Sequence, residues 1–275
     1  MGNGFDWIPV LVECKENVRA HVQPLLKTAK APQPDLGRGA GGDQMKLVDL
    51  AAEKAIVEVL LQHGLSFTLV SEESGVKLFG DQPEGCYVTV DPIDGTTNLV
   101  RGLPFYCTSI AVSGEPMLSR VHAGLVSDLF HGTTYTAELG KGAFRNREKI
   151  APSNVASLEE AVVGLDLNTY KVKNIAPRLS RLIAHTKHIR HYGANALELC
   201  FVAEGLTDAF VDIRGKLRTT DVAAGFLIVK EAGGIVTSPE GKTVDARLDP
   251  KETLRFVASG NRQIHEAILR LLELK

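Results

Sequence analysis

Three short segments of the sequence concentrate acidic residues, namely Glu72 with Glu73, Asp91 with Asp94, and the single residue Asp221. The first two segments directly follow runs typical of β-strands, and the third opens an apolar run typical of a helix. Loops at strand ends and helix starts converge to form sites. Clustered carboxylates with few compensating bases provide the oxygen ligands that hard divalent cations prefer. Together the three segments predict a metal site.

The segment Asp-Pro-Ile-Asp-Gly-Thr-Thr-Asn at positions 91–98 is the most specific of the three. Its proline fixes a turn that directs the carboxylates of Asp91 and Asp94 and the carbonyl of Ile93 to the same side. Gly95 allows the backbone to approach a ligand closely, and Thr96 opens a short helix whose free N–H groups bind an anion. Two metal ions beside a phosphate-binding turn are what a phosphoryl-transfer enzyme requires.

Each acidic segment also has an ordinary structural interpretation when it is taken alone. Asp-Pro and Asp-Gly are common turn dipeptides, and Glu72 with Glu73 suits a solvated loop. Asp221 is a good N-cap for the helix that follows, which ends at Gly233 and Gly234 as a helix C-terminus does. The metal site is favoured because all three segments occur in one chain.

Three further patterns carry little functional information. The glycines at 37–42 satisfy the pattern GxGxxG, but a dinucleotide site needs a strand directly before it, and residues 31–35 are Ala-Pro-Gln-Pro-Asp. This segment predicts a mobile surface loop near an active site. His185, His188 and His191 recur every third residue, a spacing that neither a helix nor a strand gathers around a metal. The basic stretch at 214–218 suits a solvated turn.

Apolar periodicity predicts the elements that position these residues. Helices are expected at 6–29, with an interruption at Pro24, and at 46–62, followed by strands at 66–70, 86–90, 109–112, 122–126 and 133–137. After residue 152, helices at 158–160, 175–186, 196–204 and 221–232 alternate with strands at 161–165, 209–213, 234–236 and 256–259, and a terminal helix covers 263–274. The pattern predicts an α/β fold with a mixed or antiparallel sheet in an N-terminal half, 1–152, and an alternating C-terminal half, 153–275.

Composition limits the function classes. The chain has 275 residues, with 31 Lys and Arg against 33 Asp and Glu, so its net charge of −2 gives no long-range attraction to nucleic acid or to an anionic membrane. The longest apolar run, 223–229, is far shorter than the roughly 20 residues that span a bilayer, and the N-terminus lacks a signal-peptide pattern. The four scattered cysteines have no zinc spacing. We expect a cytoplasmic protein with reduced thiols.

The motif at 91–98, with Glu-Glu-Ser at 72–74 upstream and Asp-Val-Ala-Ala-Gly at 221–225 downstream, resembles that of the inositol monophosphatase family of Mg²⁺-dependent, Li⁺-sensitive sugar phosphatases. It is most similar to the archaeal branch, whose members hydrolyse both inositol monophosphate and fructose 1,6-bisphosphate. The resemblance implies an αβαβα sandwich, a homodimer and a phosphate-ester substrate. It also implies two or three Mg²⁺ ions per active site, with Mn²⁺ as a substitute.

The resemblance further assigns roles to residues. The metal ligands that it implies are Glu72, Asp91, the backbone carbonyl of Ile93, Asp94 and Asp221. The acid that activates water lies 23 residues before the glutamate motif, at Asp49, with Thr96 orienting the water; Asp43, in the glycine-rich segment, is the rival position. The substrate contacts that it implies are Asp94, Gly95, Thr96, Arg190, Asn195 and Arg214.

Two departures from the family pattern bear on the substrate. Thr220 stands where many members have tryptophan, and Arg214 stands where the animal enzymes hold inositol hydroxyls with an acidic residue. An arginine suits a second phosphate better than strict inositol specificity. The expected function is therefore Mg²⁺-dependent hydrolysis of fructose 1,6-bisphosphate and myo-inositol 1-phosphate.

Two alternatives stay open at this point. One is a 3′-phosphoadenosine 5′-phosphate or NADP(H) phosphatase of the same superfamily. The other, from a different class, is a non-catalytic protein that binds a sugar phosphate or a metal. The complete acidic set argues against the second alternative, because a binder would not need the candidate base Asp49.

Overall fold

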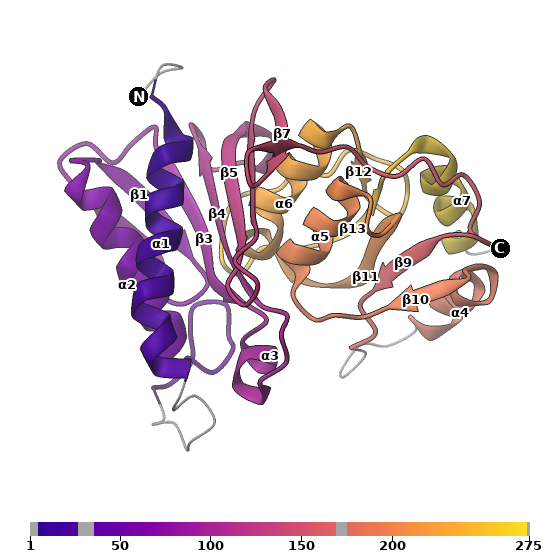
Figure 1. Cartoon of the computed structure of the whole chain (residues 1–275), viewed down its shortest axis with the longest axis horizontal. Coiled ribbons are helices and arrows are strands. Elements are labelled where there is room, and N and C mark those ends of the chain that lie inside the picture. The colour runs from indigo at the N-terminus through magenta and orange to yellow at the C-terminus, as the bar shows by residue number, and fades with distance from the viewer. Residues whose placement is uncertain (1–4, 27–35, 169–174, 274–275) are drawn as a thin grey trace.

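The computed structural model describes residues 5–26, 36–168 and 175–273, and the strands among them form two sheets (Figure 1). The first sheet has eight strands in the order β2-β1-β3-β4-β5-β6-β7-β8. The second has five strands in the order β10-β9-β11-β13-β12. The prediction that two halves meet at 152/153 stays a prediction, although the strands of the two sheets fall on either side of that point.

The elements up to residue 149 are two long helices, the strands of the first sheet and two short helices. They are α1 (Trp7–Leu26), α2 (Leu47–Gln62), β1 (Phe67–Ser71), β2 (Gly75–Phe79), β3 (Tyr87–Asp94), α3 (Thr96–Arg101), β4 (Cys107–Ser113), the 3₁₀ helix η1 (Leu118–Arg120), β5 (Val121–Asp128), β6 (Thr134–Glu138), β7 (Gly142–Arg145) and β8 (Glu148–Lys149).

The later elements alternate between helices and the strands of the second sheet. They are β9 (Val162–Leu165), α4 (Ala176–His185), β10 (His188–Arg190), α5 (Asn195–Glu204), β11 (Ala209–Arg218), α6 (Thr219–Ala232), β12 (Ile235–Thr237), β13 (Thr253–Ser259) and α7 (Arg262–Leu272).

Helices and sheets alternate in five layers (Figure 1). Helices α1 and α2 cover the outer face of the first sheet, α5 and α6 lie between the two sheets, and α4 and α7 cover the outer face of the second. Three hydrophobic cores fill the spaces between the layers and are represented in turn by Ile56, Ile228 and Leu182. The predictions of an α/β fold and of an αβαβα sandwich are therefore confirmed.

The central position of α6 explains its apolar sequence. Every residue from Thr219 to Val229 is buried, because strands of both sheets pack around the helix. Gly124 of β5 allows this close approach, since a Cβ at that position would lie 3.2 Å from the Cα of Ala224. A helix that is buried on all sides shows no polar face, which is why the run 223–229 lacks the alternation of a surface helix.

Most predicted elements are present within a few residues of their expected bounds. Four short strands, β2, β7, β8 and β10, were not predicted, since their side chains are mostly exposed or half-buried and they contain no continuous apolar run. Helix α1 continues past the expected interruption at Pro24 and ends at Leu26. The tails of the predicted helices at 27–29 and at 274 lie outside the described residues.

Three local predictions are wrong. Residues 158–160 form a turn, because β9 begins at Val162 and leaves no length for a helix. Asp221 is not an N-cap, since α6 begins two residues earlier and the Asp221 carboxylate instead accepts the backbone N–H of Arg218 at 2.9 Å. The stretch 214–218 is the end of β11, with a register shift between Asp212 and Leu217, rather than a solvated turn.

Within the described ranges, no helix combines the length and the apolar composition that a membrane span requires. All four cysteines, Cys14, Cys86, Cys107 and Cys200, are buried and free.

Candidate active site

A cavity of about 850 Å³ opens where the ends of β1, β3 and β11 meet the starts of α2, α3 and α6. Its lining contains almost every residue that the sequence predicted for the site: Asp49, Glu72, Asp91, Ile93, Asp94, Gly95, Thr96, Asn195, Arg214 and Asp221. The remaining one, Arg190, does not line the cavity. It is exposed on β10, and its guanidinium donates to the carbonyl of Ile189 at 3.0 Å.

Glu72, Asp91 and Asp221 form a carboxylate cluster in which one oxygen from each lies within 4.8 Å of the other two. Strands β1 and β3 run parallel, with Ser71 opposite Val90, so the residues that follow these two positions lie side by side. Asp221 joins them from the first turn of α6, which packs against β3. Residues 149 positions apart in the chain thus meet at one point, because helix α6 lies between the two sheets.

Burial and mutual repulsion raise the pKa values of these acids. The pKa of Glu72 lies well above its ordinary value because the group is buried and because Asp221 repels it. Burial, and then repulsion by Glu72, also raises the pKa of Asp91 well above its ordinary range. Carboxylates held together at such a cost are typical of hard-cation sites, where a divalent metal supplies the missing charge. The donor set present here fits Mg²⁺.

Asp94 lines the same cavity but lies outside the cluster. Its Oδ2 accepts the N–H of Ala196 at 2.6 Å and the thiol of Cys107 at 3.7 Å, which fixes the side chain against the start of α5. Burial, and then repulsion by Asp221, raises the pKa of Asp94 to about 7. Beside it, the buried Oδ1 of Asn195 has no hydrogen-bond partner among the described residues, as expected for an atom that a ligand satisfies.

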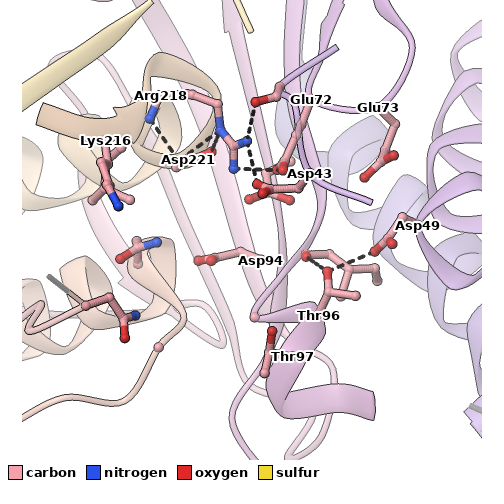
Figure 2. Close-up of a pocket in the computed structure, with 18 of the residues that line it drawn as sticks. Asp43, Asp49, Glu72, Glu73, Asp94, Thr96, Thr97, Lys216, Arg218 and Asp221 are labelled. Carbon is pink, nitrogen blue, oxygen red and sulfur yellow. Dashed lines mark hydrogen bonds and ion pairs between the residues drawn. The ribbon is translucent and has the colours of Figure 1, made fainter. Parts of the chain in front are cut away.

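A tight turn joins β3 to α3 and presents Thr96 to the cavity. Gly95 has φ +88°, and a Cβ there would lie 3.0 Å from the carbonyl oxygen of Phe105, so only glycine fits without strain. The hydroxyl of Thr96 lies 3.0 Å from Asp49 Oδ1 and 2.9 Å from the carbonyl oxygen of Ile93 (Figure 2). The turn therefore connects the metal-ligand segment with α2.

Asp49 is the third residue of α2 and is only 2% exposed. Its Oδ2 accepts the backbone N–H of Lys46 at 3.1 Å. Burial raises the pKa of Asp49 to about 7, although the hydrogen bond from Thr96 acts in the opposite direction and lowers it. A carboxyl group that titrates near neutral pH suits a general base. The rival position, Asp43, has a side chain that is 77% exposed and pairs with Arg218, whereas the hydroxyl of Thr96 bonds to Asp49.

Arg214, predicted as a substrate contact, lines the cavity but is already paired. Its Nε lies 3.1 Å from both carboxylate oxygens of Asp212, and its Nη2 forms a second ion pair with Asp166, which follows β9. All three side chains are 6% exposed or less. Two carboxylates therefore compensate the charge of Arg214, which weakens the argument from sequence that this arginine is placed for a second phosphate.

Arg218 is the site residue that the sequence reasoning missed. Its guanidinium lies between Glu72 at 2.7 Å, Asp221 at 3.3 Å and Asp43 at 2.9 Å (Figure 2). The expectation of few compensating bases therefore needs correction, because one cation does contact the cluster. A signal was present in the sequence: Arg218 stands three residues before Asp221, the spacing of an ion pair across the first turn of a helix.

The match to known proteins extends over almost the whole chain. Residues 11–274 match the model of the inositol monophosphatase family. A solved structure described as an inositol monophosphatase–fructose 1,6-bisphosphatase superposes with a TM-score of 0.86 at 27% identity, covering 98% of this chain and 100% of that one. The fold and the carboxylate-lined cavity thus define the class, and the chain belongs to the inositol monophosphatase family.

Two curated relatives have names that bear on activity. The fructose-1,6-bisphosphatase/inositol-1-monophosphatase of Methanothermobacter thermautotrophicus is 39% identical over 98% of this chain and 97% of its own length. The bifunctional NADP phosphatase/NAD kinase of Methanococcus maripaludis is 32% identical over 96% of this chain, but the match spans 49% of that longer protein.

Proposed function

We propose that this protein is a Mg²⁺-dependent phosphatase that hydrolyses sugar and inositol phosphate monoesters, with fructose 1,6-bisphosphate and myo-inositol 1-phosphate as substrates. The observation that carries the proposal is a single cavity that contains both the carboxylate cluster of Glu72, Asp91 and Asp221 and the Asp49–Thr96 pair. A metal site adjoining a positioned base is what hydrolysis by activated water needs.

Metal binding in this proposal uses Glu72, Asp91, Asp221, the carbonyl of Ile93 and Asp94. Bound Mg²⁺ supplies a lowered pKa for water and positive charge for the leaving oxygen. The family supports metal dependence in general, and the cluster supports Glu72, Asp91 and Asp221 as ligands. That the ions are Mg²⁺ and number two or three is part of the proposal.

Proton transfer in this proposal falls to Asp49. Its carboxylate accepts a proton from the attacking water, while the hydroxyl of Thr96, 3.0 Å from Asp49 Oδ1, orients that water. The turn at Gly95 allows the phosphate to approach the backbone, and the N–H groups of Gly95 and Thr96 are its proposed donors. No covalent enzyme intermediate is required: the water oxygen bonds to the phosphorus as the bond between phosphorus and the sugar oxygen breaks, and the departing sugar alkoxide takes up a proton from solvent.

The sugar portion of the substrate is proposed to lie toward Asp94, Asn195 and Arg214. The unpartnered Oδ1 of Asn195 supports this direction, since it can accept a hydroxyl proton. Arg190 stays a predicted contact that this structure does not bring to the cavity. The homodimer and a cytoplasmic location also stay predictions, and light scattering of the purified protein would test the first.

The NADP(H) or 3′-phosphoadenosine 5′-phosphate phosphatase remains the second candidate. One observation favours it: a relative that is 32% identical over almost the whole chain is named an NADP phosphatase in part. A cavity of about 850 Å³ also falls within the size range of pockets that hold drug-sized ligands.

Phosphate release with Mg²⁺ tests the proposal directly. Fructose 1,6-bisphosphate, myo-inositol 1-phosphate, NADP⁺ and 3′-phosphoadenosine 5′-phosphate are compared side by side, with and without EDTA. We expect comparable turnover of the first two and none in EDTA. Turnover of the nucleotides alone would retain the metal site and replace the substrate. If none of the four releases phosphate in a Mg²⁺-dependent way, a binding protein is the better description.

A further inference from the structure

Arg218 contacts four groups of the cavity with one guanidinium. Its Nη2 lies 2.7 Å from Glu72, its Nε lies 3.3 Å from Asp221, and its Nη1 lies 2.9 Å from Asp43 and 3.1 Å from the carbonyl oxygen of Gly41. Only 15% of the side chain is exposed. The guanidinium is therefore a fixed component of the carboxylate cluster rather than a surface charge that happens to lie near it.

The position of this cation creates a conflict with a bound metal. Arg218 binds oxygens of Glu72 and Asp221, two of the three residues whose oxygens lie close enough to hold one divalent ion. An oxygen that accepts a charged hydrogen bond is a poorer metal ligand, and two like charges a few ångströms apart repel strongly where water is excluded. Guanidinium and metal thus compete for the same two side chains.

The same arginine also holds the glycine loop, which we define as residues 37–44. The backbone of this loop donates to the carbonyls of Glu72 and Glu73, from Gly41 at 2.7 Å and from Ala40 at 2.9 Å. A Cβ at position 41 would lie 2.5 Å from Arg218 Nη1, so glycine is required for this approach. Arg218 therefore joins the loop to the carboxylate cluster.

We propose that Arg218 is a positioning residue: a cation of the chain itself that competes with the divalent metal for Glu72 and Asp221 and holds the glycine loop against the site. The inference rests on the proposed function in one respect, that the cluster binds a divalent cation. Arg218 lies outside the implied set of metal ligands, and its competition determines how tightly that cation binds.

Calorimetric titration with MgCl₂ tests the competition. Arg218→Met removes the charge and is expected to bind Mg²⁺ at least roughly tenfold more tightly than the wild type. Arg218→Lys keeps a charge and should lie near the wild-type value. The matched control is Arg145→Met, which removes an arginine paired with Glu204 at 3.1 Å outside the cavity and should leave Mg²⁺ affinity unchanged.

Stability and loop exchange provide readouts that do not depend on activity. In EDTA, Arg218→Met is expected to melt at a lower temperature than the wild type, because the carboxylates of Glu72 and Asp221 lose their ion-pair partner. Adding MgCl₂ should raise the melting temperature of the variant by more than it raises that of the wild type. Hydrogen exchange of the amides of Ala40 and Gly41 should be faster in the variant without metal, since both donate to the strand end in the wild type.

The outcomes separate this inference from the proposed function. A folded Arg218→Met that binds Mg²⁺ no more tightly than the wild type overturns the inference alone. A wild-type protein that binds no divalent cation overturns both. If Arg218→Met does not fold, Asp43→Asn decides, since it removes the ion pair between Arg218 and the loop and leaves the weaker bond to the Gly41 carbonyl, while Arg218 keeps its contacts with Glu72 and Asp221. Faster loop exchange with Mg²⁺ affinity within roughly twofold of wild type supports the inference, and unchanged loop exchange contradicts it.

Discussion

Arg214 and Arg218 lie four residues apart on β11, and both line the cavity, yet their surroundings differ in charge balance. Arg214 is enclosed by Asp166 and Asp212, both from the later part of the chain. Arg218 contacts Asp43 and Glu72 from the earlier part of the chain and Asp221 from the later part, and it also lowers the pKa of the nearby Asp91. Asp166 and Asp212 are therefore paired with one arginine between them. The carboxylate cluster around Arg218 contains more acids than one guanidinium balances, so it still needs positive charge.

The largest expected effect on activity comes from the carboxylate cluster that Arg218 contacts. Asp91→Asn should reduce phosphate release by more than roughly a thousandfold, because it removes a buried carboxylate that the proposed metal needs. The fold should survive, with an unchanged or higher melting temperature in EDTA, since repulsion by Glu72 is relieved. Asp221→Asn should behave in the same way. Loss of soluble, folded protein in both variants would show that these acids are structural.

The next largest effect is expected at Asp49, the proposed general base. Asp49→Asn should lower kcat by roughly 10²- to 10⁴-fold with little change in KM or Mg²⁺ affinity, because the side chain contacts Thr96 rather than the cluster. Steady-state kinetics and calorimetry check this. Asp43→Asn is the comparison variant, and a larger loss of kcat there than at Asp49 would reverse the two assignments.

The sharpest test of the contrast between the two arginines is Arg214→Met. It should lower the free energy of unfolding by about 3 to 5 kcal/mol, since it leaves the buried carboxylates of Asp166 and Asp212 without their cation. Mg²⁺ affinity should not change. Urea denaturation measures the first quantity, and adding Asp212→Asn should restore part of the loss. A stable Arg214→Met that loses turnover of the bisphosphate alone would instead make Arg214 a substrate residue.

The smallest effect is expected at Glu198, a buried carboxyl group that neither arginine contacts. Burial raises its pKa to about 8, although the N–H groups of Tyr192 and Gly193 donate to it. A carboxyl with a raised native pKa holds its proton in the folded state longer than in the unfolded state, so stability falls as pH rises toward that value. Between pH 6 and 7.5 the wild type should lose about 2 kcal/mol more than Glu198→Gln. Parallel pH dependences in the two proteins would contradict this.

The α/β class followed from local periodicity and the αβαβα arrangement from the family resemblance, and both agree with the structure. The acids that the sequence singled out line one cavity, and their roles stay predictions. The motif at 91–98 contains the turn at Gly95 and the start of α3 within eight residues. The arginines were harder to interpret, since pairing of Arg214 with Asp166 and of Arg218 with Glu72 depends on contacts between distant segments. No local signal shows that a carboxylate far along the chain already neutralises an arginine.

The short strands and the start of α6 were missed for a related reason. Strand β10 has three residues and is held by pairing with β9, so its structure comes from a neighbour rather than from its own sequence. Helix α6 begins at Thr219 because Arg218 and Asp221 close its first turn through backbone and side-chain bonds. Propensity alone places the helix start at the acid itself, two residues too late.

The carboxylate cluster draws Glu72 and Asp91 from the ends of two strands of the first sheet and Asp221 from the helix between the sheets. Its geometry exists only while these layers are docked, so cation affinity reports on tertiary assembly. By mass action, a divalent ion that binds the folded state alone stabilises the docked arrangement, and a chelator removes that contribution. Loss of cation affinity during gentle denaturation would therefore mark the first separation of the layers, before secondary structure is lost.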